Sequence, residues 1–441
     1  MKVLFLVSSP GKGHARCAEA IDAALKSREP ALESAFLDTH DIIDARVSAA
    51  ITNGYLRMIA ERPALYQRLY DMDRGLYRQL SGELPADADI AGFLAEEQRR
   101  SFPELAGRSR LIAAHRNLDT ALLNTLVNGV RESRRSPRTR LVMKGLLRLI
   151  YRMLARRLEE AVRSRGPDVL IATQMYPATL LRHAIESGDL RQPLIGVITD
   201  YGVHGVWVQP TIGHYCLPHA STAQMLGDRG VPGERVHVTG MPMMPVFASP
   251  PAQAEARRRL ALDDRPTVLI TGGGFGIGTL DAVRRVMGQA PPASRILVSA
   301  PAATPGYDEL RELAALIPES LALYPWTDDM AVLISAADVV VGKPGGLTVS
   351  EALACGRPFI ATRSLGGQEA HNVRFLERYG VGRHVSPEGL APCLRELFEK
   401  PARLRAWQER VAATGLRHGA TSVAKLIERC VGAPRARELA G

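Results

Sequence analysis

The chain of 441 residues is 46% hydrophobic and 23% charged, and its 56 basic and 46 acidic residues give a net charge of +10. This length favours two or three globular domains, and the composition excludes a disordered or fibrous protein. No apolar stretch reaches the ~18 residues that a membrane-spanning helix requires. The apolar run at residues 3–7 is too short for a secretory signal, and the five scattered cysteines, without a Cys-x-x-Cys pair, predict reduced thiols in the cytoplasm.

Short apolar runs alternate with helical patterns along the chain, an order typical of parallel α/β domains. The predicted strands cover residues 3–7, 169–172, 194–199, 215–217 and 236–238 in the first half, and 268–271, 295–299, 321–324, 339–341 and 359–361 in the second. Four prolines in residues 241–251 predict a linker between two α/β units. We therefore expect an N-terminal domain at 1–245, a C-terminal domain at 246–400 and terminal helices at 401–441.

Residues from about 55 to 165 show helical patterns only, and the segment 131–165 holds twelve basic and three acidic residues. At 100° per residue, one face of a helix there is basic and the opposite face is apolar. The basic face carries Arg140, Lys144, Arg148, Arg152 and Arg156. Such a helix either lies in a membrane interface or packs its apolar face on its own domain. Because Tyr151 is the one aromatic residue of this segment, we predict no nucleic-acid partner.

The first predicted strand leads into SSPGKGHARC, residues 8–17. This loop lacks the serine or threonine of a Walker A motif after Lys12, and it lacks the third glycine of a dinucleotide fingerprint. Gly11 and Gly13 would let the backbone approach a ligand closely. His14 stands at the start of a helix and at the carboxyl end of a strand, where the helix N-terminus lowers its pKa. These features suit a general base near neutral pH, and the alternative is an exposed loop histidine.

Two glycine-rich segments in the second half each stand between a predicted strand and a helix. TGGGFGIGTL, residues 271–280, predicts a cradle of backbone N–H groups for an anion, with a ligand-free flexible turn as the alternative. GKPGGLTVSEALACGRPFI, residues 342–360, opens a helix that Gly346 or Thr348 would cap. It places Glu351 one turn into that helix, where a carboxylate can accept hydrogen bonds from both hydroxyls of a ribose. The alternative for Glu351 is a capping or surface role.

Two further motifs carry polar groups at loop positions. GGQEAHN, residues 366–372, offers amide and carboxylate groups suited to sugar hydroxyls. TDYGVHGVW, residues 199–207, places Asp200 and His204 after a strand, with Trp207 as an apolar wall. By itself the Asp/His pair is typical of a hydrogen-bonded structural loop rather than of a metal site or catalytic dyad. Because no His-x-x-x-His pair or carboxylate cluster has metal-ligand spacing, we predict no bound metal.

Taken in order, these motifs resemble the glycosyltransferases that make monogalactosyl- and glucosyl-diacylglycerol. The resemblance rests on PGKGHARCAEAI, TDYGVHGVW, HVTGMPMMPVF, TGGGFGIG, KPGGLTVSEALACGRPFI and GQEAHN. It covers about residues 1–400 and is weakest in 60–165. It implies a GT-B fold, in which two Rossmann-like parallel-sheet domains face each other across a cleft, with a helical insertion in the N-terminal domain and final helices that cross back to that domain. Pro10 and Lys12 depart from the family's Gly-Gly-Gly-His opening.

The resemblance also implies an inverting, metal-independent transfer of glucose or galactose from a UDP-sugar substrate to diacylglycerol, without a cofactor. His14 would be the catalytic base, and the acceptor side would contain Gly11, Gly13, Asp200, His204 and Trp207. The donor side would contain Gly272, Gly273, Gly274, Phe275, Gly276, Trp326, Lys343, Gly345, Gly346, Thr348, Glu351, Gln368, Glu369 and Asn372. The glycine loop would neutralise the departing diphosphate, and Lys343 would reach a phosphate. Glu351 would hold the ribose, and the main chain near Trp326 would read the uracil. Gln368, Glu369 and Asn372 would grip the sugar or the phosphates.

A lipid acceptor strengthens the membrane interpretation of the basic helix, since each Lys or Arg near an anionic surface contributes ~1 kcal/mol. We therefore expect a cytoplasmic protein that docks on the inner face of the cell membrane. Two alternatives stay open from the sequence. One is an N-acetylglucosamine transferase that acts on a polyprenyl-linked or other lipid acceptor. The other is a non-catalytic protein that binds a nucleotide sugar or a lipid. The sequence does not choose between glucose and galactose or predict an oligomeric state.

Overall fold

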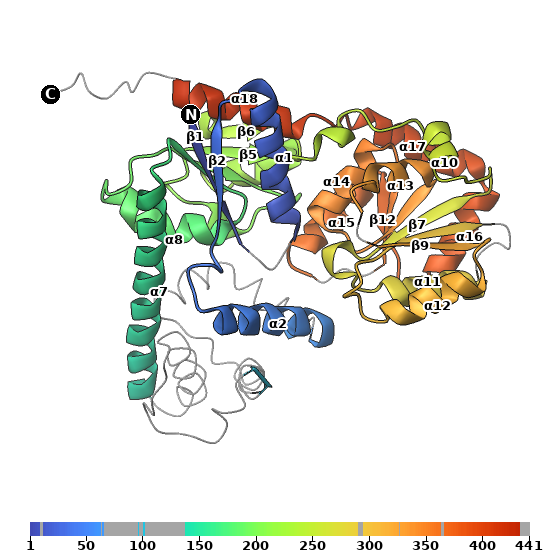
Figure 1. Ribbon diagram of the computed structural model, residues 1–441, viewed down its shortest axis with the longest axis horizontal. Coiled ribbons are helices and arrows are strands. Elements are labelled where there is room, and N and C mark those ends of the chain that lie inside the picture. The colour runs from blue at the N-terminus through green and yellow to red at the C-terminus, as the bar shows by residue number, and fades with distance from the viewer. Residues whose placement is uncertain are drawn as a thin grey trace.

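The computed structural model describes residues 1–8, 12–62, 64, 65, 96, 100, 101, 137–289, 294–325, 327–362 and 366–432. These residues form two α/β units that lie side by side, each built on a six-stranded parallel sheet (Figure 1). The two α/β units predicted from the alternating pattern are thereby confirmed.

The first sheet has the strand order β2-β1-β3-β4-β5-β6. Its strands are β1 (Lys2–Val7), β2 (Glu33–Asp38), β3 (Val169–Ala172), β4 (Leu194–Val197), β5 (His214–Leu217) and β6 (Val236–Val238). The helices of this unit are α1 (Lys12–Arg28), α2 (Ala45–Glu61), α7 (Pro137–Arg165), α8 (Met175–Glu186) and α9 (Ala220–Gly227).

Helices cover both faces of the first sheet, which explains why β1 is apolar without alternation. Val3 and Phe5 lie in one buried cluster with residues of α1, and Leu4 and Leu6 lie in another with residues of α7 and α8. The β1 strand is thus a central strand with no solvent-facing side.

The second sheet has the order β12-β11-β10-β7-β8-β9. Its strands are β7 (Thr267–Thr271), β8 (Arg295–Ser299), β9 (Leu321–Tyr324), β10 (Val339–Gly342), β11 (Phe359–Ala361) and β12 (Gly382–His384). The helices that follow the linker are α10 (Gln253–Arg259), α11 (Thr279–Gln289), α12 (Tyr307–Leu316), α13 (Met330–Ala336), α14 (Gly346–Ala354), α15 (Gln368–Arg378), α16 (Leu390–Glu399) and α17 (Pro401–Ala413).

All the predicted strands are present, and two strands, β2 and β12, were not predicted. Both are edge strands that pair on one side only. An edge strand buries less surface than a central one, so its sequence lacks a continuous apolar run. In β2, for example, Phe36 is 41% exposed. The strand predicted at 194–199 ends at Val197, and the residues that follow it turn into the site described below.

The last described helix, α18 (Gly419–Gly432), lies against α1 of the first unit (Figure 1). Val423 and Ile427 share a buried cluster with Ile21 and Leu25 of α1. The Arg28 guanidinium donates to both carboxylate oxygens of Glu428, at 2.6 and 2.8 Å. The chain therefore returns to the unit in which it began.

Helix α7 is 29 residues long and is attached to the first unit through its C-terminal half. Leu158 and Val162 are fully buried, and the Tyr151 hydroxyl donates to the carbonyl of Thr179 at 2.6 Å. Arg148, Arg152 and Arg156 are exposed, as predicted for one face. Arg140 and Lys144 lie in the same helix, but their side chains are outside the described part of the structure, as is most of the predicted insertion between α2 and α7.

Candidate functional site

The predicted site loops lie at the points where the strand order of each sheet reverses. In the first sheet, β2 and β3 lie on opposite sides of β1, and in the second, β8 and β10 lie on opposite sides of β7. Ligands of open α/β sheets bind at such points, beyond the carboxyl ends of the strands. The His14 loop follows β1, the glycine loop follows β7, and Lys343 follows β10. Three motifs identified by sequence therefore lie at positions that favour ligand binding.

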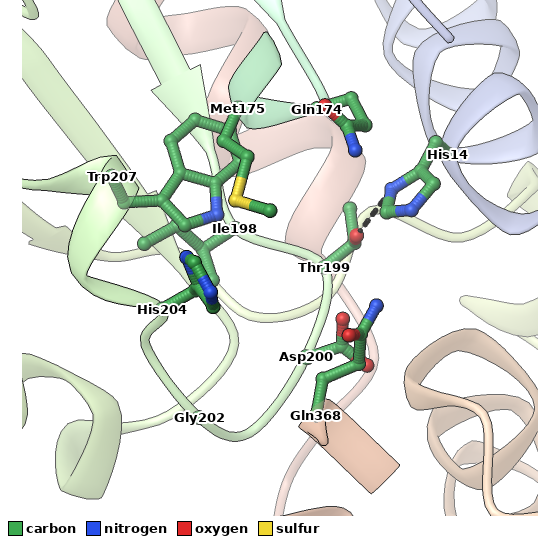
Figure 2. A pocket seen from close by; sticks show the side chains of 10 residues that line it. All are labelled: His14, Gln174, Met175, Ile198, Thr199, Asp200, Gly202, His204, Trp207 and Gln368. Carbon is green, nitrogen blue, oxygen red and sulfur yellow. Dashed lines mark hydrogen bonds between the residues drawn. The ribbon is translucent and has the colours of Figure 1, made fainter. Parts of the chain in front are cut away.

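A pocket opens beside His14 and is lined by residues of both units (Figure 2). The residues that line it are His14, Gln174, Met175, Ile198, Thr199, Asp200, Gly202, His204, Trp207 and Gln368. Gln368 belongs to α15 of the second unit, and the rest belong to the first. The pocket therefore brings together the predicted base, the predicted acceptor residues Asp200, His204 and Trp207, and one predicted donor residue.

His14 is held by its Nδ1 atom. Nδ1 lies 3.0 Å from the carbonyl oxygen of Thr173 and 2.9 Å from Oγ1 of Thr199, a contact drawn in Figure 2. A carbonyl can only accept a hydrogen bond, so Nδ1 carries the proton and Nε2 carries the lone pair. Burial, with a smaller contribution from the nearby Lys343, lowers the pKa of His14 to about 4, while the hydrogen bond with the Thr173 carbonyl opposes the shift. His14 is thus neutral at pH 7 and can accept a proton at Nε2.

Thr173 and Thr199, the two residues that orient His14, were not predicted as site residues, and neither were Gln174 and Met175 of the pocket. Their position after predicted strands could have identified them, because Thr173 and Gln174 follow β3 directly and Thr199 follows β4 by two residues. Residues just beyond the carboxyl ends of parallel strands are candidates for a site even when their side chains carry no charge.

Asp200, which lines the pocket, and the buried Asn372 join the two units. Asn372 is fully buried, and its Nδ2 donates to Oδ1 of Asp200 and to the carbonyl of Pro344, each at 2.9 Å. Its Oδ1 accepts from the backbone N–H of Tyr201 at 2.8 Å. Burial raises the pKa of Asp200 to about 6, although the hydrogen bond from Asn372 opposes the shift. In this structure, the amide of Asn372 is therefore occupied by the contact between the units.

The start of α14 is also part of this contact. A Cβ atom on Gly346 would lie 2.1 Å from the carbonyl oxygen of Thr199 and 2.9 Å from Oδ1 of Asp200. Only glycine allows the backbone of α14 to come this close to the loop after β4. The prediction that Gly346 or Thr348 caps α14 is wrong, because the N-cap residue is Gly345. Gly346 is the first residue of the helix, Thr348 lies in its first turn, and the N-cap uses no side-chain hydrogen bond.

His204 and Trp207 are buried beside the pocket, at 7% and 6% exposure. The ring of Trp207 packs on Gly196, where a Cβ atom would lie 3.1 Å from it. Nδ1 of His204 accepts from the backbone N–H of Val206 at 3.3 Å and so caps a short 3-10 turn. Together with Met175 and Ile198, Trp207 makes one end of the pocket apolar.

The glycine loop that follows β7 forms a 3-10 turn over Gly273–Phe275. Gly273 and Gly276 have φ values of 65° and 62°, in the left-handed region that favours glycine. A Cβ atom on Gly272 would lie 2.2 Å from the carbonyl carbon of Gly276, so the loop closes tightly on itself. The loop leads into α11, whose N-terminus points toward it, as an anion cradle requires.

Three charged residues of the predicted donor side lie in the second unit. Lys343 forms an ion pair with Glu369, which is 6% exposed, so each provides the other's counter-charge. Glu351 lies in the second turn of α14, and burial raises its pKa to about 8, while Arg16 of the first unit lowers it. Glu351 is therefore protonated at neutral pH in the ligand-free protein.

The predicted residues Gly11 and Trp326 lie outside the described part of the chain. Gly13 lies beside α14, since a Cβ atom on it would be 3.8 Å from Cβ of Leu347. Within the residues that the structure describes, no group of three or more His, Cys, Asp and Glu side chains is placed to hold a metal ion. None of the described helices combines the length and the apolar character that crossing a membrane requires.

Sequence comparison relates this chain to enzymes of glycolipid synthesis. Residues 135–243 match the family model for monogalactosyldiacylglycerol (MGDG) synthase. A processive diacylglycerol beta-glucosyltransferase of Bacillus pumilus is 25% identical over 286 residues, which are 64% of this chain and 73% of that protein. One of Staphylococcus saprophyticus is 25% identical over 59% of this chain and 66% of its own length. A probable chloroplastic MGDG synthase of Glycine max is 28% identical over 56% of this chain and 48% of that protein.

Solved structures with the same fold cover nearly the whole chain. HepE of Anabaena, crystallised in complex with UDP, superposes with a TM-score of 0.51 at 14% identity, over 98% of this chain and 100% of HepE. MurG of Acinetobacter baumannii superposes with a TM-score of 0.54 at 14% identity, over 97% of this chain and 100% of MurG. These likenesses concern the fold alone. The fold is GT-B, with two Rossmann-like domains, as the sequence motifs implied.

Proposed function

We propose that this chain, which is similar in sequence to monogalactosyldiacylglycerol synthases and processive diacylglycerol glucosyltransferases, transfers glucose or galactose from a UDP-sugar to diacylglycerol. The observation that carries the proposal is the position of His14. It is a neutral imidazole at the switch point of the first sheet, it lines a pocket between the units, and its helix begins beside α14 of the second unit.

In this mechanism, the acceptor hydroxyl enters the pocket and gives its proton to Nε2 of His14. The hydroxyl oxygen attacks the anomeric carbon from the face opposite the diphosphate. The bond from the anomeric carbon to the β-phosphate oxygen breaks, and its electron pair leaves with UDP. A single displacement of this kind inverts the configuration. As the imidazolium forms, its Nδ1–H bond to the Thr173 carbonyl becomes charge-assisted and therefore stronger.

On the donor side, the glycine loop and the N-terminus of α14 present backbone N–H groups toward the diphosphate. Such groups, with nearby cations, stabilise the charge of the leaving UDP in the way that a metal ion does elsewhere. The two hydroxyls of the ribose would contact the carboxyl group of Glu351. We therefore expect transfer to continue at an unchanged rate after treatment with EDTA, and a rate restored only by added Mg²⁺ or Mn²⁺ would contradict this part of the proposal.

The acceptor is a lipid, so the enzyme would dock on an anionic membrane surface, at the inner face of the cell membrane. Exposed arginines at i, i+4 spacing on α7, with Leu149 59% exposed among them, support this docking. Vesicle flotation tests it. Wild-type protein should float with vesicles of 30% phosphatidylglycerol at low salt, and replacement of Arg148, Arg152 and Arg156 by Gln should abolish this. Flotation that is indifferent to both salt and these arginines would contradict it.

The central experiment mixes the purified chain with diacylglycerol vesicles and equimolar UDP-glucose, UDP-galactose and UDP-N-acetylglucosamine, and identifies the lipid products by mass. A hexosyl-diacylglycerol supports the proposal. Transfer of N-acetylglucosamine to a polyprenyl acceptor supplied in parallel would replace it with the alternative activity. His14→Ala should bind UDP as the wild type does but turn over at least ~100-fold more slowly. UDP binding without any transfer by the wild type would favour a non-catalytic binding protein.

A further inference from the structure

Lys12, the residue that departs from the family's glycine, lies across the glycine loop of the other unit. A Cβ atom built on Gly274 would be 3.1 Å from Cδ and 3.2 Å from Cβ and Cγ of Lys12. The φ of Gly274 is outside the left-handed region, in contrast to those of Gly273 and Gly276. Space for the lysine stem, rather than backbone conformation, is therefore what glycine supplies at position 274.

The stem of Lys12 brings its side chain against the glycine loop of the second unit. Lys12 is the first residue of α1, and the same end of α1 lies next to α14 (Figure 1). The ammonium group is two bonds beyond Cδ, and Cδ lies against a loop whose geometry suits an anion. Arg16, one turn further along the same face of α1, also reaches the second unit, where it pairs with Asp328 at 3.3 Å.

Two further cations of the site form ion pairs with carboxylates. Lys343 is paired with Glu369, and Arg16 is paired with Glu19 as well as with Asp328. A diphosphate carries more negative charge than backbone N–H groups alone neutralise. A lysine at the start of α1 brings a further cation to the glycine loop, and lysine binds phosphate as a point charge without a fixed hydrogen-bonding plane.

We propose that Lys12 binds the diphosphate of the sugar donor from the opposite unit and stabilises the charge that develops on departing UDP. This inference rests on the proposed function and names a residue for its donor step. When the bond to the anomeric carbon breaks, the electron pair goes to the β-phosphate oxygen beside the Lys12 ammonium. Lys12 takes no part in proton transfer, because the acceptor's proton goes to His14. The bound donor then links the second unit to the first through the side chain of Lys12.

Calorimetric titration with UDP, UMP and uridine tests the assignment without requiring transfer. Lys12→Met keeps the aliphatic stem and removes the charge, so the affinity for UDP should fall about 10- to 100-fold, as for loss of a charged hydrogen bond. The affinity for uridine should change less than about twofold, and Lys12→Arg should retain most of the affinity for UDP. Lys26→Met is the matched control, because Lys26 lies at the other end of α1 and pairs with Asp22.

Two results would overturn the proposal. Unchanged UDP affinity in Lys12→Met removes Lys12 from the donor site. An equal loss for UDP, UMP and uridine, or a lower melting midpoint than that of Lys26→Met, assigns Lys12 a structural role instead. Gly274→Ala provides a second variant, since its methyl group must displace the lysine stem by a few tenths of an ångström. It should weaken UDP binding in the wild type but not in Lys12→Met. If wild-type protein binds UDP in a Lys12-dependent way yet transfers no hexose, the proposed function fails and this assignment stands.

Discussion

Replacement of Asn372 by Asp should loosen the contact between the two units in a pH-dependent way. The substitution keeps the shape of the side chain and the hydrogen bond from the Tyr201 N–H. It replaces two donated bonds, to Asp200 and to the Pro344 carbonyl, by contacts between acceptors. A buried group left without its partner costs about 1–3 kcal/mol. Because Asn372 is fully buried, the free energy of unfolding should fall by about 2–6 kcal/mol at pH 8.

The pH dependence follows from the neighbouring carboxyl group. Burial already raises the pKa of Asp200 to about 6, and a second carboxylate beside it raises both values. A carboxyl group whose pKa is raised by folding holds its proton longer in the folded state than in the unfolded state. Its contribution to stability is therefore present at low pH and is lost as pH rises through the folded-state pKa. The loss in Asn372→Asp should be smaller at pH 5, where one shared proton restores a donor.

Urea unfolding at pH 5 and pH 8 measures the effect, and hydrogen exchange of the peptide that contains Tyr201 reports on the contact itself. Asn53→Asp, on the exposed surface of α2, is the matched control for the change of charge. The reasoning would be refuted by a loss below about 1 kcal/mol at pH 8, since even one unsatisfied buried acceptor costs that much. It would also be refuted by equal losses at pH 5 and pH 8.

Three further predictions concern residues that follow strands β1, β4 and β7. The pKa of His14 is about 4 in the folded state, below its ordinary value of 6.5, so the unfolded state binds the proton first and stability is lost as pH falls from about 6.5 toward 4. His14→Gln should therefore flatten the profile of unfolding free energy against pH in this range. An unchanged profile would contradict the lowered pKa of His14. Thr199→Val removes the hydroxyl 2.9 Å from Nδ1 of His14, so kcat should fall several-fold with UDP affinity unchanged; equal kcat would show that Thr199 does not position the base. Gly276→Ala puts a Cβ atom 2.0 Å from Oγ1 of Thr304, at a residue whose φ is 62°, so the affinity for UDP should fall at least tenfold. Gly145→Ala is the control, because a Cβ atom there meets open space and should leave the affinity for UDP unchanged.

The candidate site was only partly predictable from the sequence. The loops that carry His14, the glycine cradle and Glu351 are recognisable because each joins an apolar strand to a helix. The partners of these residues are not recognisable in the same way. Thr173 and Thr199 lie 159 and 185 residues from His14, and both are small neutral residues without a chemical signature. Asn372 was predicted to grip the donor, yet in this structure its amide binds Asp200, 172 residues away.

The sequence by itself determined the two parallel sheets, because their central strands are buried on both faces and appear as continuous apolar runs. The order of its motifs also indicated a resemblance to the diacylglycerol glycosyltransferases, because that order is more specific than any one motif. Only the tertiary structure decided which residues of the two units meet. The strand order of each sheet places its loops at a switch point, and the contact between the units then sets Lys12 over Gly274 and Asn372 against Asp200. Such pairings depend on distances in space that no local pattern of residues encodes.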